Sequence, residues 1–170
     1  MREILFRGKR IDNREWVEGY YYKMSETTYC FKEDYERNPV QEHHYILQER
    51  MTDWGLPNQV VQIGIDPETL CQFTGLTDKS GKRIWENDVL MCHGNPQELV
   101  RAVFGEFGVT DLETESVTDE VIGWHYEVIY TDELSRTEPF CYSMPLTKEY
   151  IKRLEMEVVD NPELLQEDAE

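Results

Sequence analysis

The sequence predicts a mostly β protein with a minor helical content, an α+β fold in which strands dominate. Two observations support this prediction. Short segments rich in Val, Ile, Tyr, Phe and Trp recur along the chain, separated by polar or glycine-containing turn signals. Only one or two short segments fit a helix. A chain of 170 residues suits one domain or two small ones and can bury a core without disulfides or metal.

The first third of the chain predicts two strands, a loop and one ambiguous segment. "EILFRGKRIDNREWVEGYYYKM" fits a strand, a polar turn and a second strand. "SETTYCFKEDYERNPVQE" begins with β-formers and becomes a polar loop, with a boundary signal at Asn38-Pro39. Residues 43–54 remain open between a strand over 43–48 and a short helix from near Gln41, because so short a run does not settle its period.

The middle of the chain predicts two strands around the turn Asp66-Pro67, then a hairpin and a second tight turn. In "TDKSGK", Gly81 occupies the position that needs a positive φ. Asn87 stands where a left-handed residue would turn the chain before the strand "DVLMC".

The C-terminal half predicts further strands and one helix. We expect a loop at "GNPQE", a strand pair in "LVRAVFGEFGVT" and an acidic solvated loop in "DLETESVTDE". "VIGWHYEVIYTD" and "EPFCYSMPL" fit strands, and a helix entered at Thr147 runs toward a final strand. The last residues, "DNPELLQEDAE", fit a turn and a frayed acidic end.

The charge is strongly acidic and unevenly distributed. The chain holds 17 basic and 35 acidic residues, a net charge of −18. Residues 1–85 hold 12 Lys/Arg and 14 Asp/Glu, whereas residues 86–170 hold 5 and 21. Such a surface repels phosphates, so the composition disfavours nucleic acid as a partner. The favoured interpretation of the acidity is that it keeps the protein soluble and forms a solvated tail. The functional alternative is an acidic surface that docks on a basic protein or imitates DNA.

Targeting signals and cysteine usage indicate a cytoplasmic protein. No apolar run approaches the ~20 residues that span a membrane, and "MREILFRGKR" lacks the apolar stretch of a signal peptide. Four scattered cysteines without a CxxC motif predict reduced thiols. Cys30, Cys71 and Cys141 lie beside aromatic residues, which predicts that they belong to the core.

Four segments together resemble the YopX family of phage and prophage proteins nearly end to end. These are "ILFRGKR", "WVEGYY", the central "DPETLCQFTGLTDKSGKRIWENDVL" and the closing "VVDNPELL". The central motif keeps its order and spacing at Gln72, Phe73, Thr74, Gly75, Leu76, Asp78, Gly81, Glu86 and Asp88. Asn87 replaces a glycine usual in the family, and the closing motif lacks its usual upstream Ile-Gly-Asn.

The resemblance implies a β-rich fold, a phage or prophage origin in a bacterial host, and no established activity. It implies that the turn before residue 89 leads into an SH3-like small barrel. We therefore expect an N-terminal β-rich portion, residues 1–78, packed against a C-terminal SH3-like barrel portion with an acidic tail, residues 79–170. The alternative is that the two portions form one continuous globular unit.

The carboxylates of the central motif, which we call the signature segment (residues 72–88), have two interpretations. Paired carboxylates on adjacent turns can act as acid and base. However, Asp78 can bond the turn backbone, Asp88 can cap the amides around Asn87, and no nucleophile is placed beside them. We therefore predict that the signature segment, including Glu86, is structural, and we predict no catalytic residue.

No other constellation predicts chemistry or a cofactor. Cys92-His93 and His43-His44 are neighbours that would point to opposite faces of a strand. These residues and His125 do not show the sequence spacing that is typical of zinc ligands, so the sequence does not support a zinc site that combines them. The chain contains no P-loop, GxGxxG, HExxH or nucleophile elbow. We predict no cofactor and no metal, and an enzyme is disfavoured.

The sequence favours a non-catalytic accessory protein that contacts an unidentified protein or itself as a homo-oligomer through an exposed strand edge. Its expected contact surface holds Trp124, Tyr126 and Tyr130. One alternative is a nucleic-acid-binding or DNA-mimicking module, with a footprint at Lys9, Arg10 and Arg14 near Trp16 and Tyr20. The second is a metal-dependent or small-molecule enzyme whose pocket gathers His43, His44, Cys92 or His125.

Overall fold

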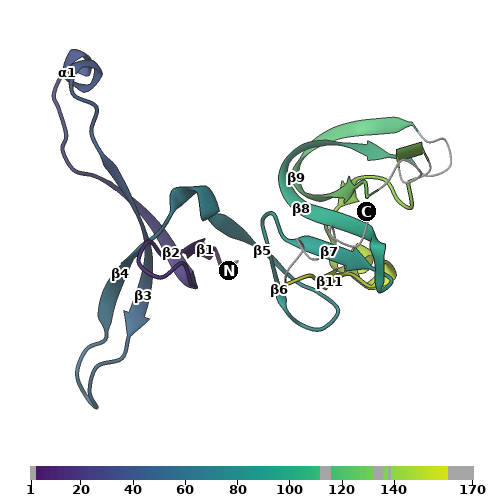
Figure 1. The fold of residues 1–170 in the computed structure, drawn as a ribbon, viewed down its shortest axis with the longest axis horizontal. Helices are drawn as coiled ribbons and strands as arrows, with labels where there is room; N and C mark the ends of the chain where they lie inside the picture. The colour runs from purple at the N-terminus through teal and green to yellow at the C-terminus, as the bar shows by residue number, and fades with distance from the viewer. Residues whose placement is uncertain (1–2, 112–115, 132–135, 138, 161–170) are drawn as a thin grey trace. The chain divides into compact units, whose positions relative to one another are not determined.

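The computed structural model describes residues 3–111, 116–131, 136–137 and 139–160, and it confirms a mostly β chain with two antiparallel sheets (Figure 1). Contacts divide the chain into two compact units, Met1–Gln72 and Phe73–Glu170. In the part of the chain that the structure describes, no helix has both the length and the apolar character needed to cross a membrane.

The first unit is built on a long antiparallel sheet. The strand order of this sheet is β4-β3-β2-β1-β5-β6, and β5 begins in the first unit and continues into the second. The elements are β1 (Phe6–Lys9), β2 (Trp16–Ser25), α1 (Lys32–Arg37), β3 (Glu42–Arg50), β4 (Gln59–Gly64), the short 3₁₀ helix η1 (Pro67–Thr69) and β5 (Cys71–Thr77). The ambiguous segment after Gln41 is therefore a strand, β3.

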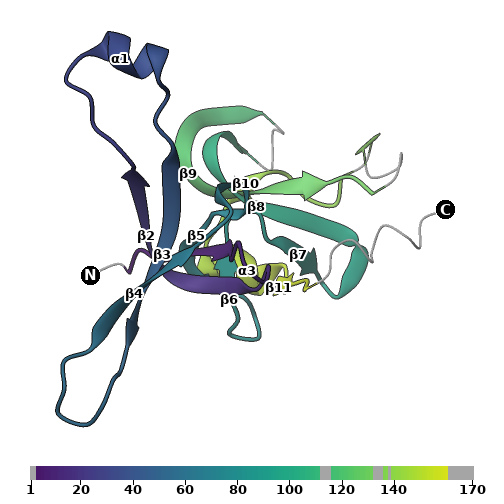
Figure 2. The same cartoon turned by 60° about the vertical axis from the view of Figure 1, so that its left-hand side comes forward.

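The first unit has a small core on one face of its sheet. Val17, Ile46 and Ile65 are buried there, with Phe6 and Tyr21 packed against them. The helix α1, which lies beyond the ends of β2 and β3 in Figure 2, has no buried residue and no side-chain cap. The sequence predicted a loop here because α1 carries neither an apolar stripe nor a capping residue to signal a helix.

The second unit contains a five-stranded sheet with the order β10-β9-β8-β7-β11. Its elements are β6 (Arg83–Trp85), which pairs with β5, then β7 (Val89–Cys92), β8 (Asn95–Thr110), β9 (Val117–Ile129), β10 (Met144–Pro145), α3 (Lys148–Arg153) and β11 (Glu157–Val158). This order is open at both ends, so the described residues form no closed barrel and the SH3-like detail is not confirmed.

The helix and final strand predicted after Thr147 are confirmed as α3 and β11. Thr147 Oγ1 accepts a hydrogen bond from Tyr150 N at 3.2 Å, which caps the helix. Ile151 of α3 is buried in a core to which all the main strands of this unit contribute. That core comprises Ile84, Leu90, Cys92, Val100, Ala102, Tyr126, Met144, Leu146, Ile151 and Met156.

Two strand predictions in this unit are wrong. The expected strand pair over 99–110 is one strand, β8, which already begins at Asn95 in the expected loop. Gly105 lies opposite Gly123 of β9, so this glycine sits inside a ladder and does not end a strand. Of the described residues in "EPFCYSMPL" (139–146), only Met144 and Pro145 form a strand, β10. The predicted acidic loop is also wrong in part, because residues 117–120 begin β9, while its residues 112–115 lie outside the described residues. All of the predicted acidic end except Asp160 lies outside them.

The cysteines follow the core prediction with one exception. Cys71 and Cys92 are buried and Cys141 is half-buried, but Cys30 is exposed. Cys30 lies in the connection between β2 and α1, beyond the small core of the first unit, so no apolar neighbours cover it.

Candidate functional site

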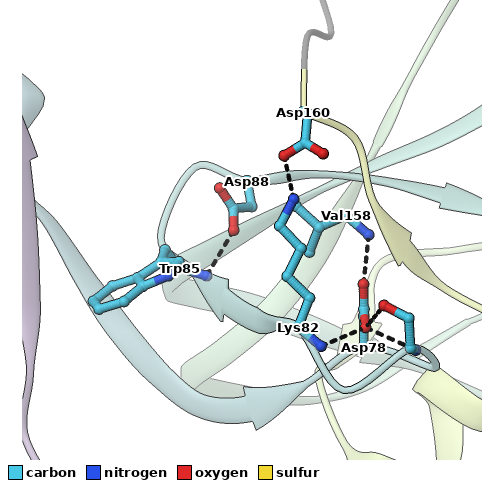
Figure 3. Close-up of polar contacts among 7 residues, drawn as sticks. Asp78, Lys82, Trp85, Asp88, Val158 and Asp160 are labelled. Atoms are coloured by element: carbon cyan, nitrogen blue, oxygen red, sulfur yellow. Dashed lines mark hydrogen bonds and ion pairs between the residues drawn. The ribbon is translucent and has the colours of Figure 1, made fainter. Parts of the chain in front are cut away.

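The hairpin between β5 and β6 is organised by the Asp78 carboxylate, which is only 5% exposed (Figure 3). Asp78 Oδ1 accepts hydrogen bonds from Ser80 N at 2.8 Å, Ser80 Oγ at 2.7 Å and Lys82 N at 2.9 Å. Asp78 Oδ2 accepts from Val158 N of β11 at 3.0 Å. One carboxylate thus closes a turn and joins it to a strand 80 residues later in the chain.

The hydrogen bonds of Asp78 set its ionisation. Burial disfavours the charged form, but the bonds donated by Val158, Ser80 and Lys82 together outweigh it and hold the pKa of Asp78 below its ordinary value. Gly81 completes this turn with φ of 91°, as predicted. Lys82 Nζ forms an ion pair with Asp160 beside it (Figure 3).

The turn between β6 and β7 uses the second predicted pair of residues. Asn87 has φ of 64°, the left-handed backbone that the sequence predicts. The buried Asp88 accepts a hydrogen bond from Trp85 N at 2.8 Å through Oδ2. Asn87 N donates to Ala102 O at 2.8 Å, so this turn is fixed onto β8.

The remaining signature residues also contact backbone or core. Thr74 Oγ1 donates to Ile84 O at 2.8 Å and accepts from Leu76 N at 3.2 Å. Gly75 has φ of 86°. Leu76 packs on the core of the second unit. The Phe73 and Trp85 ring centroids are 5.4 Å apart. Gln72 pairs with Phe6 of β1, and Glu86 is half-buried.

The chemical capacity of the signature segment is therefore that of a backbone organiser. Asp78 and Asp88 each accept main-chain amide bonds, and the donors around Asp78 lower its pKa and keep its carboxylate ionised near neutral pH. Among the described residues, no group of three or more His, Cys, Asp and Glu side chains is placed to hold a metal ion.

The histidines and Cys92 have local partners. In the first unit, His43 Nε2 lies 2.7 Å from Glu26 Oε1, and His44 Nδ1 lies 2.7 Å from the Tyr21 hydroxyl. In the second, His93 Nδ1 lies 2.6 Å from Glu98 Oε2. His125 is buried against the Phe107 ring, with ring centroids 4.4 Å apart. Burial raises the pKa of Cys92 to about 12, so its thiol is no nucleophile near neutral pH.

The predicted contact surface in the acidic half is largely internal. Tyr126 is 1% exposed and belongs to the core, so its assignment to a surface is wrong. Trp124 is half-buried and its ring packs edge-on against Phe104 at 5.1 Å. Tyr130 is exposed. Alternation along β9 placed Tyr126 on one of two faces, and the sequence did not show which face meets the core.

A more exposed aromatic surface than the predicted contact surface lies on the first unit. Trp16, Tyr20, Tyr22 and Met24 lie on one face of β2, which also carries Glu18, and the four are each between 38% and 56% exposed. Tyr20 pairs with Leu47 and Tyr22 pairs with Tyr45, so these β3 residues share the same face. We call these six hydrophobic residues the β2 aromatic face. The period of two in "WVEGYYYKM" was the available signal.

The basic cluster predicted beside this face is mostly compensated. Arg10 and Arg14 form ion pairs of 2.6 Å with Asp12 and Asp66. Lys9 Nζ lies 5.3 Å from the centroid of the Trp16 ring. Lys9 therefore lies over one end of the β2 aromatic face, while Arg10 and Arg14 are paired with carboxylates, so these three cations do not form an open basic groove.

These features define an antiparallel β protein of two units with a turn-rich signature segment fixed by backbone hydrogen bonds. The chain belongs to the YopX family, described as YopX protein, whose match covers residues 5–166 and confirms the resemblance. No match was found among curated proteins or among solved structures. Family membership suggests a phage-type protein, and the family is not a known enzyme family.

Proposed function

We propose that this YopX-family protein is a non-catalytic phage or prophage accessory protein that acts in the host cytoplasm through protein contacts. The β2 aromatic face is the contact surface in this proposal, and the signature segment serves as scaffold. The observation that carries the proposal is the row of four large apolar side chains exposed on one face of β2.

The pleat of β2 explains why these side chains are available. Val17 and Tyr21 point to the opposite face, where they meet the core around Ile46. The core needs only that face, so Tyr20 and Tyr22 are not required for packing within the unit. Tyr and Trp supply large, rigid contact area and are the residues that dominate binding energy at protein interfaces.

The test is recovery of a partner from the native host during phage induction. We expect wild-type tagged protein to recover a defined protein, and the double variant Tyr20→Ser/Tyr22→Ser to recover at least about tenfold less, since aromatic anchors carry most of the affinity. Both side chains are exposed, so we expect the double variant to retain the fold. Circular dichroism checks this.

The matched control is Tyr130→Ser, which removes an exposed tyrosine from the second unit. It should leave recovery unchanged. Loss with Tyr130→Ser and not with the double variant would move the contact surface to the acidic half. Light scattering of the purified chain separates self-association from binding of another protein, and the absence of both would overturn the proposal.

A second candidate function rests on the cations beside the aromatic face. The guanidinium carbon of Arg7 lies 4.5 Å from the Trp16 ring centroid, and Lys9 lies over the same ring. Cations beside exposed aromatic rings are the elements of a single-stranded nucleic-acid platform. Such binding would weaken steeply as salt rises. A filter-binding titration with an oligonucleotide at about 50 mM salt, where counterion release is most favourable, tests it.

A further inference from the structure

A cavity of about 180 Å³ lies in the second unit between β9, β10, α3 and the segment before β10. Four aromatic rings dominate its lining: Tyr126, Phe140, Tyr142 and Tyr150. Met144, Leu154 and Pro139 add apolar surface. A cavity of about 150 Å³ accommodates benzene, so this one holds a single six-membered ring with a small substituent.

Two polar side chains that line this cavity, Tyr126 and Arg153, can donate hydrogen bonds. Tyr126 is 1% exposed and its side chain lines the cavity. The phenolic hydroxyl of Tyr126 can donate a hydrogen bond to water or to a ligand in the cavity. Arg153 also lines the cavity and forms no ion pair within the described ranges. Both groups can donate to the same acceptor.

The charge of the lining selects the sign of the ligand. Arg153 is the one charged residue among the described residues that line the cavity, and no carboxylate is present there to attract a cation. The nearby Glu98 is occupied, because Oε2 lies 2.6 Å from His93 Nδ1 and Oε1 accepts from Asn95 Nδ2 at 2.8 Å. An anionic group is therefore favoured at the Arg153 side of the cavity.

The remaining reactive group, Cys141, acts only as packing surface. Burial raises the pKa of the Cys141 thiol to about 12, and the charge of Glu98 adds to this rise. The thiol is thus protonated near neutral pH and neither attacks a ligand nor binds a metal.

We propose that this cavity binds a small single-ring aromatic carboxylate, with the ring between the Tyr and Phe side chains and the carboxylate held by Arg153 and the Tyr126 hydroxyl. This site stands apart from the contact function proposed above, which uses the other unit. A protein that carries a net charge of −18 repels free anions, so saturable binding of a carboxylate requires a specific cationic contact.

The test is calorimetric titration of the full chain with benzoate, and with benzamide as a neutral probe of the same shape. For a ligand of this size we expect a Kd of about 1 mM for benzoate. Benzamide should bind at least about tenfold more weakly, because it lacks the charge-assisted bonds. Equal affinity for both probes would overturn the anionic class. No saturation by benzoate at about ten times the expected Kd would overturn the site.

Three variants locate the binding. Arg153→Gln should reduce benzoate affinity to that of benzamide while leaving benzamide unchanged, and Tyr126→Phe should weaken benzoate several-fold. Lys152→Gln is the matched control, because this exposed cation is adjacent on α3 but does not line the cavity. An equal loss in Arg153→Gln and Lys152→Gln would show general charge attraction and would contradict the proposal.

Discussion

Asp78 is the residue whose surroundings most constrain its chemistry. Its carboxylate accepts from three backbone amides and one hydroxyl, in two elements far apart in the chain. In Asp78→Asn, one side-chain oxygen becomes an amide donor that faces a backbone donor. We expect a loss of about 1–3 kcal/mol in the free energy of unfolding near neutral pH, measured with denaturant. Asp119→Asn, at an exposed position in the same unit, should change it by less than about 0.5 kcal/mol.

The same residue gives the protein a pH dependence of defined sign. The pKa of Asp78 is lower in the folded than in the unfolded chain, so its stabilisation is present above the unfolded value of about 3.9. It is lost as the pH falls through the lower, folded value. The wild type should therefore exceed Asp78→Asn by a constant margin down to about pH 5, and by a shrinking one below about pH 4. A margin that grows on acidification would contradict this.

Substitutions of Asn87 test whether the left-handed backbone conformation in the signature segment contributes to stability. Its φ of 64° is natural for glycine and tolerable for asparagine, but it places the Cβ of other residues too close to the backbone. Asn87→Ala should lower the free energy of unfolding by about 1 kcal/mol, whereas Asn87→Gly should leave it nearly unchanged. Thermal unfolding of both variants beside the wild type measures this. Equal losses in the two variants would mean that the asparagine side chain, and not its backbone angle, matters.

At the scale of elements, α3 depends on its N-cap residue, Thr147, which precedes the first helical residue. Six residues form too short a helix to persist on propensity alone, so the cap at Thr147 and the burial of Ile151 hold it. Thr147→Ala should cost about 1 kcal/mol of stability, and Thr147→Ser, which keeps the hydroxyl, should recover most of it. Denaturant unfolding of the three proteins checks this. An unaffected Thr147→Ala protein would show that core packing alone fixes α3.

The elements that sequence reasoning predicted are those with local causes. The hairpin with Gly81, the left-handed Asn87 and the cap at Thr147 each arise from residues within a few positions of one another. The long strand β8 has a non-local cause, because its pairing with β9 continues through Gly105, which lies opposite Gly123. A glycine inside a strand favours the end of that strand when the sequence is considered alone, and the pairing with β9 that continues β8 could not be seen in the sequence.

At the scale of the whole molecule, the sequence does not predict which strand faces are buried in a core and which are exposed. Alternation along β2 and along β9 gives two faces for each strand, but it does not show which face meets a core. Tyr126 is therefore internal, whereas Tyr20 is exposed. The cavity beside Tyr126 likewise depends on α3 and the segment before β10, which lie far from it in sequence.

The hydrogen bond from Val158 to Asp78 has a consequence for the folding of the chain during its synthesis. A ribosome adds about 5–20 residues per second, so the amide of Val158 follows Asp78 by about 4–16 s, because 80 positions separate them. During that interval the residues of the hairpin have been synthesised, but the hydrogen bond from Val158 that joins the hairpin to β11 cannot yet form. A chain truncated before Val158 lacks this hydrogen bond, so we expect it to be less stable and more readily degraded by quality-control proteases than the full chain.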